Sequence, residues 1–165
     1  MSFSQTDLAS ALRLLSDRLP EFSERRGEVV RLLRVTTERL SSRLNNSLKE
    51  FGINENLWIA IMAVYVSPNG QILPSQLSDL MDLTRTSATS LSDDMVERGW
   101  IERHINKEDR RQIELKLTPQ GEAFIQEAWP QVSEKSAAAW EDFTDEDYAQ
   151  LHGLLSKLLK RLGDN

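Results

Sequence analysis

The sequence predicts a mainly helical fold with one small β-hairpin. Apolar residues recur at helical spacing along most of the 165 residues. The exception is WIERHINKEDRRQIELKLT at 100–118, where two short alternating runs flank a charged tip. The chain has a net charge of −6, yet residues 98–116 hold six bases against four acids. The hairpin is therefore a locally basic feature of an acidic protein.

The N-terminal third predicts two helices. Leucines recur every three or four positions over 6–19, and Pro20 stops that helix. A longer helix follows over 24–50, and Gly52 is a suitable residue to end it. Asn54 then caps a short and very apolar helix.

Two further helices follow the turn SPNG at 67–70. Pro74 opens the first, which we expect to point three apolar residues inward: Leu77, Leu80 and Met81. Thr84 caps the second, which runs to about Arg98 and ends at Gly99. The connection between them is tight, as in a helix–turn–helix.

The C-terminal part predicts two more helices. The first covers 119–129, begins with Pro119, and is bent or interrupted by Pro130. Thr144 caps the last helix and Gly163 ends it. Six leucines form one stripe along that helix: Leu151, Leu154, Leu155, Leu158, Leu159 and Leu162. Such a stripe is too apolar for a surface helix on so small a core, so we expect it to have a partner.

A helix–turn–helix followed by a two-stranded hairpin is a winged helix-turn-helix. The predicted fold is thus mainly α with a small β-hairpin wing. We expect the winged helix-turn-helix to occupy 54–118, between helical regions at 1–53 and 119–165.

Composition and motifs exclude several classes of protein. With no cysteine, the chain has no disulfide, thiol catalysis or cysteine-ligated metal. The two histidines lack the spacing of metal ligands, so we expect no cofactor. A Gly-rich phosphate loop and a nucleophile–base pair are also missing, which argues against an enzyme. We see no secretory signal and no apolar run of the ~20 residues that cross a bilayer, so we expect a cytoplasmic protein without membrane contact.

The stretch TRTSATSLSDDMVERGWIERHINKEDRRQIELKLTPQG resembles the MarR family of bacterial regulators. The matching elements are a hydroxyl-rich recognition helix, RGWIER at 98–103, DRR at 109–111 and L-T-x-x-G at 117–121. With the helix order, the resemblance covers about residues 24–163. Together with GINENLWIAIMAV, it is similar to the branch that represses multidrug efflux pumps. The chain departs from the family at Ser90 and His104, where many relatives carry a basic residue.

The resemblance implies that Asp109 pairs with one wing arginine while another enters the minor groove. Physics favours the same division, because an anchored guanidinium suits a narrow, electronegative groove and loses less entropy on binding. Arg110 and Arg111 are both candidates for the deeper position. Further DNA contacts on the hairpin are expected from Arg103 and Lys107. The alternative is that the tip NKEDRRQ is only a solvated turn.

The recognition helix is expected to present five polar residues to DNA: Arg85, Thr86, Ser87, Thr89 and Ser90. The alternative is that these are cap and surface residues, a choice left open for Ser87. Ser75 and Gln76 begin the preceding helix, where relatives touch phosphates. Asp93 and Asp94 are expected to pair with arginines, although one could accept from a cytosine amine. Trp100 is expected to pack beneath the wing as core.

The resemblance also implies a second copy of the chain, with the helices of both chain ends, the leucine stripe included, forming a dimerisation region around the 54–118 DNA-binding region. An effector pocket is implied between the two regions, with these candidates: Leu33, Leu40, Trp58, Ile61, Met62, Tyr65 and Trp129. A mixture of Met, Tyr and Trp suits a flat aromatic guest. The alternatives are plain core for the pocket residues and intramolecular burial for the stripe.

The predicted function is a homodimeric, sequence-specific regulator of transcription. We expect a repressor that binds double-stranded DNA at a pseudo-palindromic operator and is released by a small aromatic or amphipathic ligand. The alternative is a winged-helix module that binds protein and not DNA, which the acidic balance and Ser90 favour.

Overall fold

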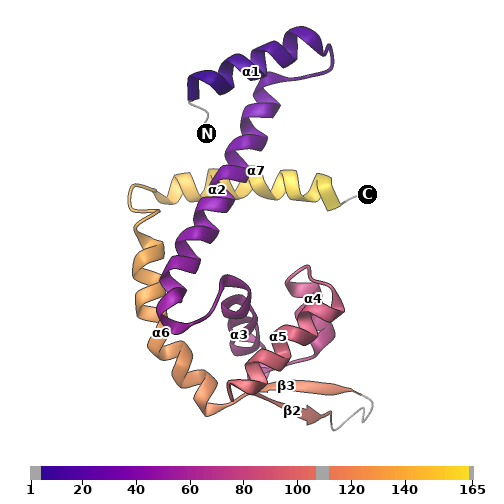
Figure 1. The fold of residues 1–165 in the computed structure, drawn as a ribbon, viewed down its shortest axis with the longest axis vertical. Helices are drawn as coiled ribbons and strands as arrows, with labels where there is room; N and C mark the ends of the chain where they lie inside the picture. The colour runs from indigo at the N-terminus through magenta and orange to yellow at the C-terminus, as the bar shows by residue number, and fades with distance from the viewer. Residues whose placement is uncertain (1–4, 107–111, 164–165) are drawn as a thin grey trace. The chain divides into compact units, whose positions relative to one another are not determined.

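A computed structural model describes residues 5–106 and 112–163 (Figure 1). The chain divides into two compact units, Met1–Asn46 and Ser47–Asn165. Over the described residues, no helix is both long and apolar enough to span a membrane.

The N-terminal unit is a pair of helices, α1 (Gln5–Arg18) and the larger part of α2 (Glu24–Leu48). Both were predicted. The helices approach closely at Gly27, where an added Cβ would lie 2.9 Å from Leu12 Cδ2 and 3.0 Å from the Phe22 ring. Several apolar side chains of this unit nevertheless stay exposed: Leu14, Leu15, Leu19, Val29, Val30 and Leu32.

The second unit contains the remaining elements. In chain order they are η1 (Lys49–Phe51), α3 (Glu55–Val66), η2 (Pro68–Gly70), β1 (Gln71–Ile72), α4 (Pro74–Leu80), α5 (Arg85–Glu97), β2 (Ile101–Ile105), β3 (Ile113–Leu117), α6 (Pro119–Ala137) and α7 (Asp145–Gly163). Helices α3, α4 and α5 pack together beside the sheet, and the β2–β3 hairpin projects from them (Figure 1). This is the predicted winged helix-turn-helix.

Local capping chemistry sets the helix ends where the sequence predicted them. Asn54 Oδ1 accepts from the Leu57 N–H at 2.9 Å, and Thr84 Oγ1 accepts from the Ser87 N–H at 3.2 Å. Gly52 has a φ of 65° and Gly99 a φ of 71°, in the left-handed region that glycine adopts without strain. These residues position α3 and α5 for packing.

The sheet is antiparallel with the strand order β1-β3-β2. In the hairpin Ile101 pairs with Leu117 and Arg103 pairs with Leu115. The sequence did not predict β1, because two residues are too few to display alternation. Its Ile72, which is 6% exposed, becomes a strand residue only through pairing with β3.

The core lies between α3, α4, α5 and the root of the wing. Its fully buried large side chains include Ile61, Leu77, Met95, Ile101 and Leu115. Trp100 is 6% exposed and stacks on Phe124 of α6, which confirms its prediction as core. The Phe124 ring also meets Phe51 and Trp58 edge to face, so one aromatic cluster joins η1, α3, the wing root and α6.

Two local predictions are corrected by the structure. Helix α6 runs through Pro130 to Ala137, so the predicted end at 129 and the interruption at Pro130 are wrong. Ala128 and Val132 are buried on either side of Pro130 and hold both halves on the core. A proline removes one helical hydrogen bond, which this packing offsets. Leu80 was expected to face inward but is 60% exposed, because α4 ends there and only Leu77 reaches the core. Met81 is half-buried.

Helix α7 begins with a reciprocal cap. The Asp147 N–H donates to Thr144 Oγ1 at 3.2 Å, and the Thr144 hydroxyl donates to Asp147 Oδ2 at 2.6 Å. The hydrogen bonds from the Thr144 side chain and backbone lower the pKa of Asp147. No residue of α7 is buried, so its leucine stripe lies open in the single chain.

Candidate nucleic-acid interface

The exposed side of α5 is lined with hydroxyls. Ala88, Ser92 and Met95 are buried on the opposite side, and this periodicity turns Thr86 and Ser90 outward. Among the described residues, the hydroxyls of Thr86 and Ser90 have no hydrogen-bond partner. They are therefore available to an external donor or acceptor.

The other hydroxyls of this helix are engaged locally. Thr89 Oγ1 donates to the Arg85 carbonyl at 2.9 Å. Ser87 Oγ lies 2.9 Å from Thr84 Oγ1, so this residue takes part in the helix cap as well as being exposed. The guanidinium of Arg85 stands at the start of the helix and is exposed.

The start of α4 adds two polar groups. Gln76 Oε1 accepts from the Leu73 N–H at 2.9 Å, which leaves its amide NH₂ exposed as a donor. Ser75 is half-buried one residue earlier. Both lie within the helix–turn–helix that also presents α5.

The two aspartates of α5 form ion pairs, as the sequence predicted. Asp94 Oδ1 lies 2.5 Å from Arg98 Nε, and Asp93 Oδ1 lies 2.5 Å from Arg103 Nη2. Arg98 also places its guanidinium carbon 5.1 Å from the centre of a Trp100 ring. Helix α5 is thus tied to the wing at two points.

The hairpin arms are described up to Asn106 and again from Gln112. Asn106 Nδ2 donates to Glu114 Oε1 at 2.6 Å across the arms. His104 Nε2 lies 3.0 Å from Glu102 Oε2 on β2. The predicted tip residues lie outside the described residues: Lys107, Asp109, Arg110 and Arg111.

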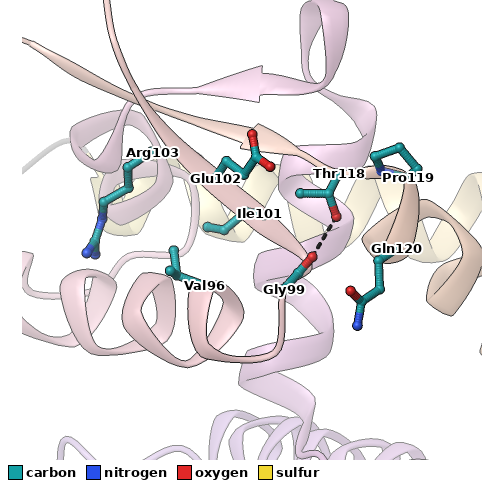
Figure 2. A pocket seen from close by; sticks show the side chains of 8 residues that line it. All are labelled: Val96, Gly99, Ile101, Glu102, Arg103, Thr118, Pro119 and Gln120. Carbon is teal, nitrogen blue, oxygen red and sulfur yellow. Dashed lines mark hydrogen bonds between the residues drawn. The ribbon is translucent and has the colours of Figure 1, made fainter.

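The root of the wing is a hydrogen-bonded joint between α5, β2 and α6. The Thr118 hydroxyl donates to the Gly99 carbonyl at 2.7 Å (Figure 2). Gln120 Nε2 donates to the Arg98 carbonyl at 3.1 Å. A hollow of about 730 Å³ lies at this joint, lined by Val96, Gly99, Ile101, Glu102, Arg103, Thr118, Pro119 and Gln120. The L-T-x-x-G motif at 117–121 lies in this joint and was noted in the sequence. That the motif joins the wing to α5 and α6 was not predicted.

The predicted pocket residues differ in burial. Trp58 and Ile61 are buried in the core of the second unit, and Met62 is half-buried. Tyr65 and Trp129 are exposed, at 41% and 51%. The two remaining candidates, Leu33 and Leu40, belong to the N-terminal unit. An effector pocket stays a prediction.

Helices α4 and α5, joined by a short turn and followed by the two-stranded β2–β3 wing, define a winged helix-turn-helix protein. In DNA-binding proteins with a helix–turn–helix, the second helix lies in the major groove.

Known proteins share this arrangement. The model of the MarR family matches residues 51–112. The transcriptional repressor MprA of Escherichia coli K12 is 33% identical over 162 residues, which cover 98% of this chain and 92% of that protein. Wild-type MarR from E. coli in its apo form aligns with a TM-score of 0.65 at 25% identity, over 78% of this chain and 94% of that one. A MarR mutant complexed with operator DNA aligns with a TM-score of 0.72 at 23% identity, over 88% and 98%.

The chain therefore belongs to the MarR family of winged helix-turn-helix transcriptional regulators. It is a DNA-binding regulator and not an enzyme, as the sequence predicted.

Proposed function

We propose that this protein is a homodimeric, sequence-specific repressor that acts in the cytoplasm at a pseudo-palindromic operator. The observation that carries the proposal is a pair of exposed hydroxyls, those of Thr86 and Ser90, on the recognition helix beside the wing. Neither has a hydrogen-bond partner in the part of the chain that the structure describes. The repressor function named for MprA and the operator complex of a MarR mutant support it.

The DNA-binding surface combines three elements. Arg85, Thr86 and Ser90 of α5 would meet base edges and phosphates in the major groove, with Thr89 and Ser87 beside them. Ser75 and Gln76 would bind phosphates of the DNA backbone. The wing would supply Arg110 or Arg111 to the minor groove, with Asp109 and Lys107 at the same tip.

The second copy of the chain would cover the leucine stripe of α7. Leu154 is 69% exposed, Leu159 71% and Leu162 66%, and these side chains share one side of the helix with Leu151, Leu155 and Leu158. Two helix–turn–helix modules then read half-sites ~34–36 Å apart, about one turn of DNA.

A small aromatic or amphipathic ligand would release the DNA. Trp129 and Tyr65 expose aromatic surface that such a guest could cover. The ligand can shift the equilibrium only if it binds the free and DNA-bound shapes with different affinity.

The test is selection of duplexes from a random-sequence pool, followed by a gel-shift titration at several salt concentrations. We expect an enriched palindrome and a steep decrease of affinity with salt, because phosphate contacts release counterions. A protein-binding winged helix is the second candidate, favoured by the net charge of −6. It would enrich no sequence and show no such salt dependence.

A further inference from the structure

The recognition helix carries a charge that DNA repels. Helix α5 holds one base, Arg85, and three acids, Asp93, Asp94 and Glu97. Asp93 follows Ser90 by three residues, so it continues the exposed hydroxyl-bearing side of the helix. Its side chain is 59% exposed. A free carboxylate at this position would oppose the approach of phosphates.

Arginines outside the helix neutralise two of these acids. Arg98, just past the end of α5, pairs with Asp94, and Arg103 in the middle of β2 pairs with Asp93. Glu97 forms no ion pair with any residue that the structure describes. The Asp93 pair differs from the Asp94 pair because it connects two separate elements, the recognition helix and the wing.

Arg103 has a fixed place at the root of the wing. It pairs across the sheet with Leu115, which is fully buried, so its backbone cannot move without disturbing the core. From β2 the side chain reaches toward α5, while Glu102 leaves the strand on the other side (Figure 2). One guanidinium nitrogen lies at hydrogen-bond distance from the carboxylate.

We propose that Asp93 and Arg103 form a positioning pair for DNA binding. Arg103 cancels the charge that Asp93 brings to the recognition helix and holds β2 against α5, and it does not itself bind a phosphate. This inference rests on the proposed function, since it concerns how the same surface meets DNA. It changes the role expected for Arg103 from contacting DNA to acting through Asp93.

The experiment compares Arg103→Gln, Asp93→Asn and the double variant. The probe is a duplex that the wild-type protein selects from a random-sequence pool, and affinity is measured at several salt concentrations. We expect Arg103→Gln to weaken binding by about tenfold, because Asp93 then faces phosphates unpaired. The double variant should return to within about threefold of wild type. Its salt slope should equal that of wild type, because no phosphate contact has been removed.

A matched control separates the pair from net charge. Glu97→Gln combined with Arg103→Gln gives the same total charge as the double variant, but leaves Asp93 unpaired. It should remain as weak as Arg103→Gln alone. If the Glu97→Gln/Arg103→Gln variant regains as much DNA affinity as the Asp93→Asn/Arg103→Gln variant, the inference is overturned. Removal of any acid from α5 would then be enough to restore binding.

A second outcome would also overturn it. If the double variant stays weak and its salt slope falls by about 0.9, then Arg103 itself binds a phosphate. Arg103→Lys keeps the charge and provides a folded reference, expected within about threefold of wild type. Enrichment of a duplex by the wild-type protein tests the proposed function, whereas the comparison among variants tests only the pair.

Discussion

The ring of Trp100 stacks on the ring of Phe124, with centroids 4.0 Å apart and 15° between the planes. Trp100 stands at the root of the wing and Phe124 in the first turns of α6. The same Phe124 ring meets Trp58 of α3 edge to face at 6.3 Å. The placement of the hairpin beside the recognition helix thus depends on a ring supplied from beyond the wing.

Removing that ring should loosen the wing root. We expect Phe124→Ala to lower the free energy of unfolding by about 2–3 kcal/mol, less than for a fully buried ring because Phe124 is half-buried. Phe124→Leu keeps most of the apolar volume and should cost only about 1 kcal/mol. Urea unfolding followed by circular dichroism measures both. Equal stability of wild type and Phe124→Ala would show that the stack contributes nothing.

A glycine at the same joint permits close approach. A Cβ on Gly121 would lie 2.3 Å from the Trp100 carbonyl oxygen, which is backbone and cannot rotate away. Gly121→Ala should therefore destabilise the protein by about 1–3 kcal/mol. Gly153→Ala is the matched control, because no described atom outside its own stretch of helix lies within 4 Å of the added Cβ. In the interior of α7 it should stabilise by about 0.5–1 kcal/mol. Thermal unfolding of the two variants should shift in opposite directions.

The sequence predicts features that depend on local chemistry. Thr84 and Asn54 cap their helices with their own side chains, and Gly99 adopts a backbone conformation suited to glycine, so neighbours in sequence decide each outcome. Features decided by distant packing were missed. Pro130 does not interrupt α6 because the buried residues around it hold the helix together.

The candidate site shows the same division. The exposed hydroxyls of α5 follow from helical periodicity, and the aspartates were expected to find arginines. The arginine partner could be predicted from sequence spacing for Asp94 but not for Asp93. Asp94 and Arg98 are four residues apart on one helix, a local pair, whereas Asp93 and Arg103 meet only because the hairpin folds back on α5. The spacing of Asp93 and Arg103 in the sequence does not predict that the hairpin brings them together.

The wing arginines are expected to supply minor-groove and phosphate contacts. Arg111→Ala should weaken DNA binding by about 1–3 kcal/mol and lower the salt slope by about 1, while the oligomeric state stays unchanged. Arg110→Ala is measured beside it by gel shift, since either arginine is a candidate for the deeper position. If both variants bind DNA with unchanged affinity, the arginines of the wing tip do not contribute to DNA binding.

Aromatic or amphipathic anions, such as phenolic compounds, are expected to bind the protein and release DNA. Trp129 is 51% exposed and Trp58 is 5% exposed, so covering the first should change its emission more than that of the second. Trp129→Phe removes the more exposed reporter and should reduce the fluorescence change. A broad panel that neither changes tryptophan emission nor releases DNA would contradict an effector switch.

The last helix is expected to make the protein a dimer, and the dimer is expected to be required for operator binding. Leu155 and Leu158 are about 40% exposed in the single chain, and Leu154, Leu159 and Leu162 are more exposed. Full burial of each leucine is worth about 1.5–3 kcal/mol, which a second copy would provide. A charge placed in that apolar seam is costly when it has no partner. Because α7 buries none of its residues within one chain, Leu158→Glu should fold and yield a monomer.

Ser156→Glu is the matched control, since it adds the same charge at an exposed position on the opposite side of α7 and should remain dimeric. Light scattering and gel shift on the same samples decide the outcome. The Leu158→Glu monomer should lose most of its specific affinity for the operator. It has one recognition helix and one wing, so it can bind only one of the two half-sites at a time. A folded Leu158→Glu protein that stays dimeric would move the interface away from α7. A monomer that keeps full operator affinity would refute the coupling between dimerisation and DNA binding.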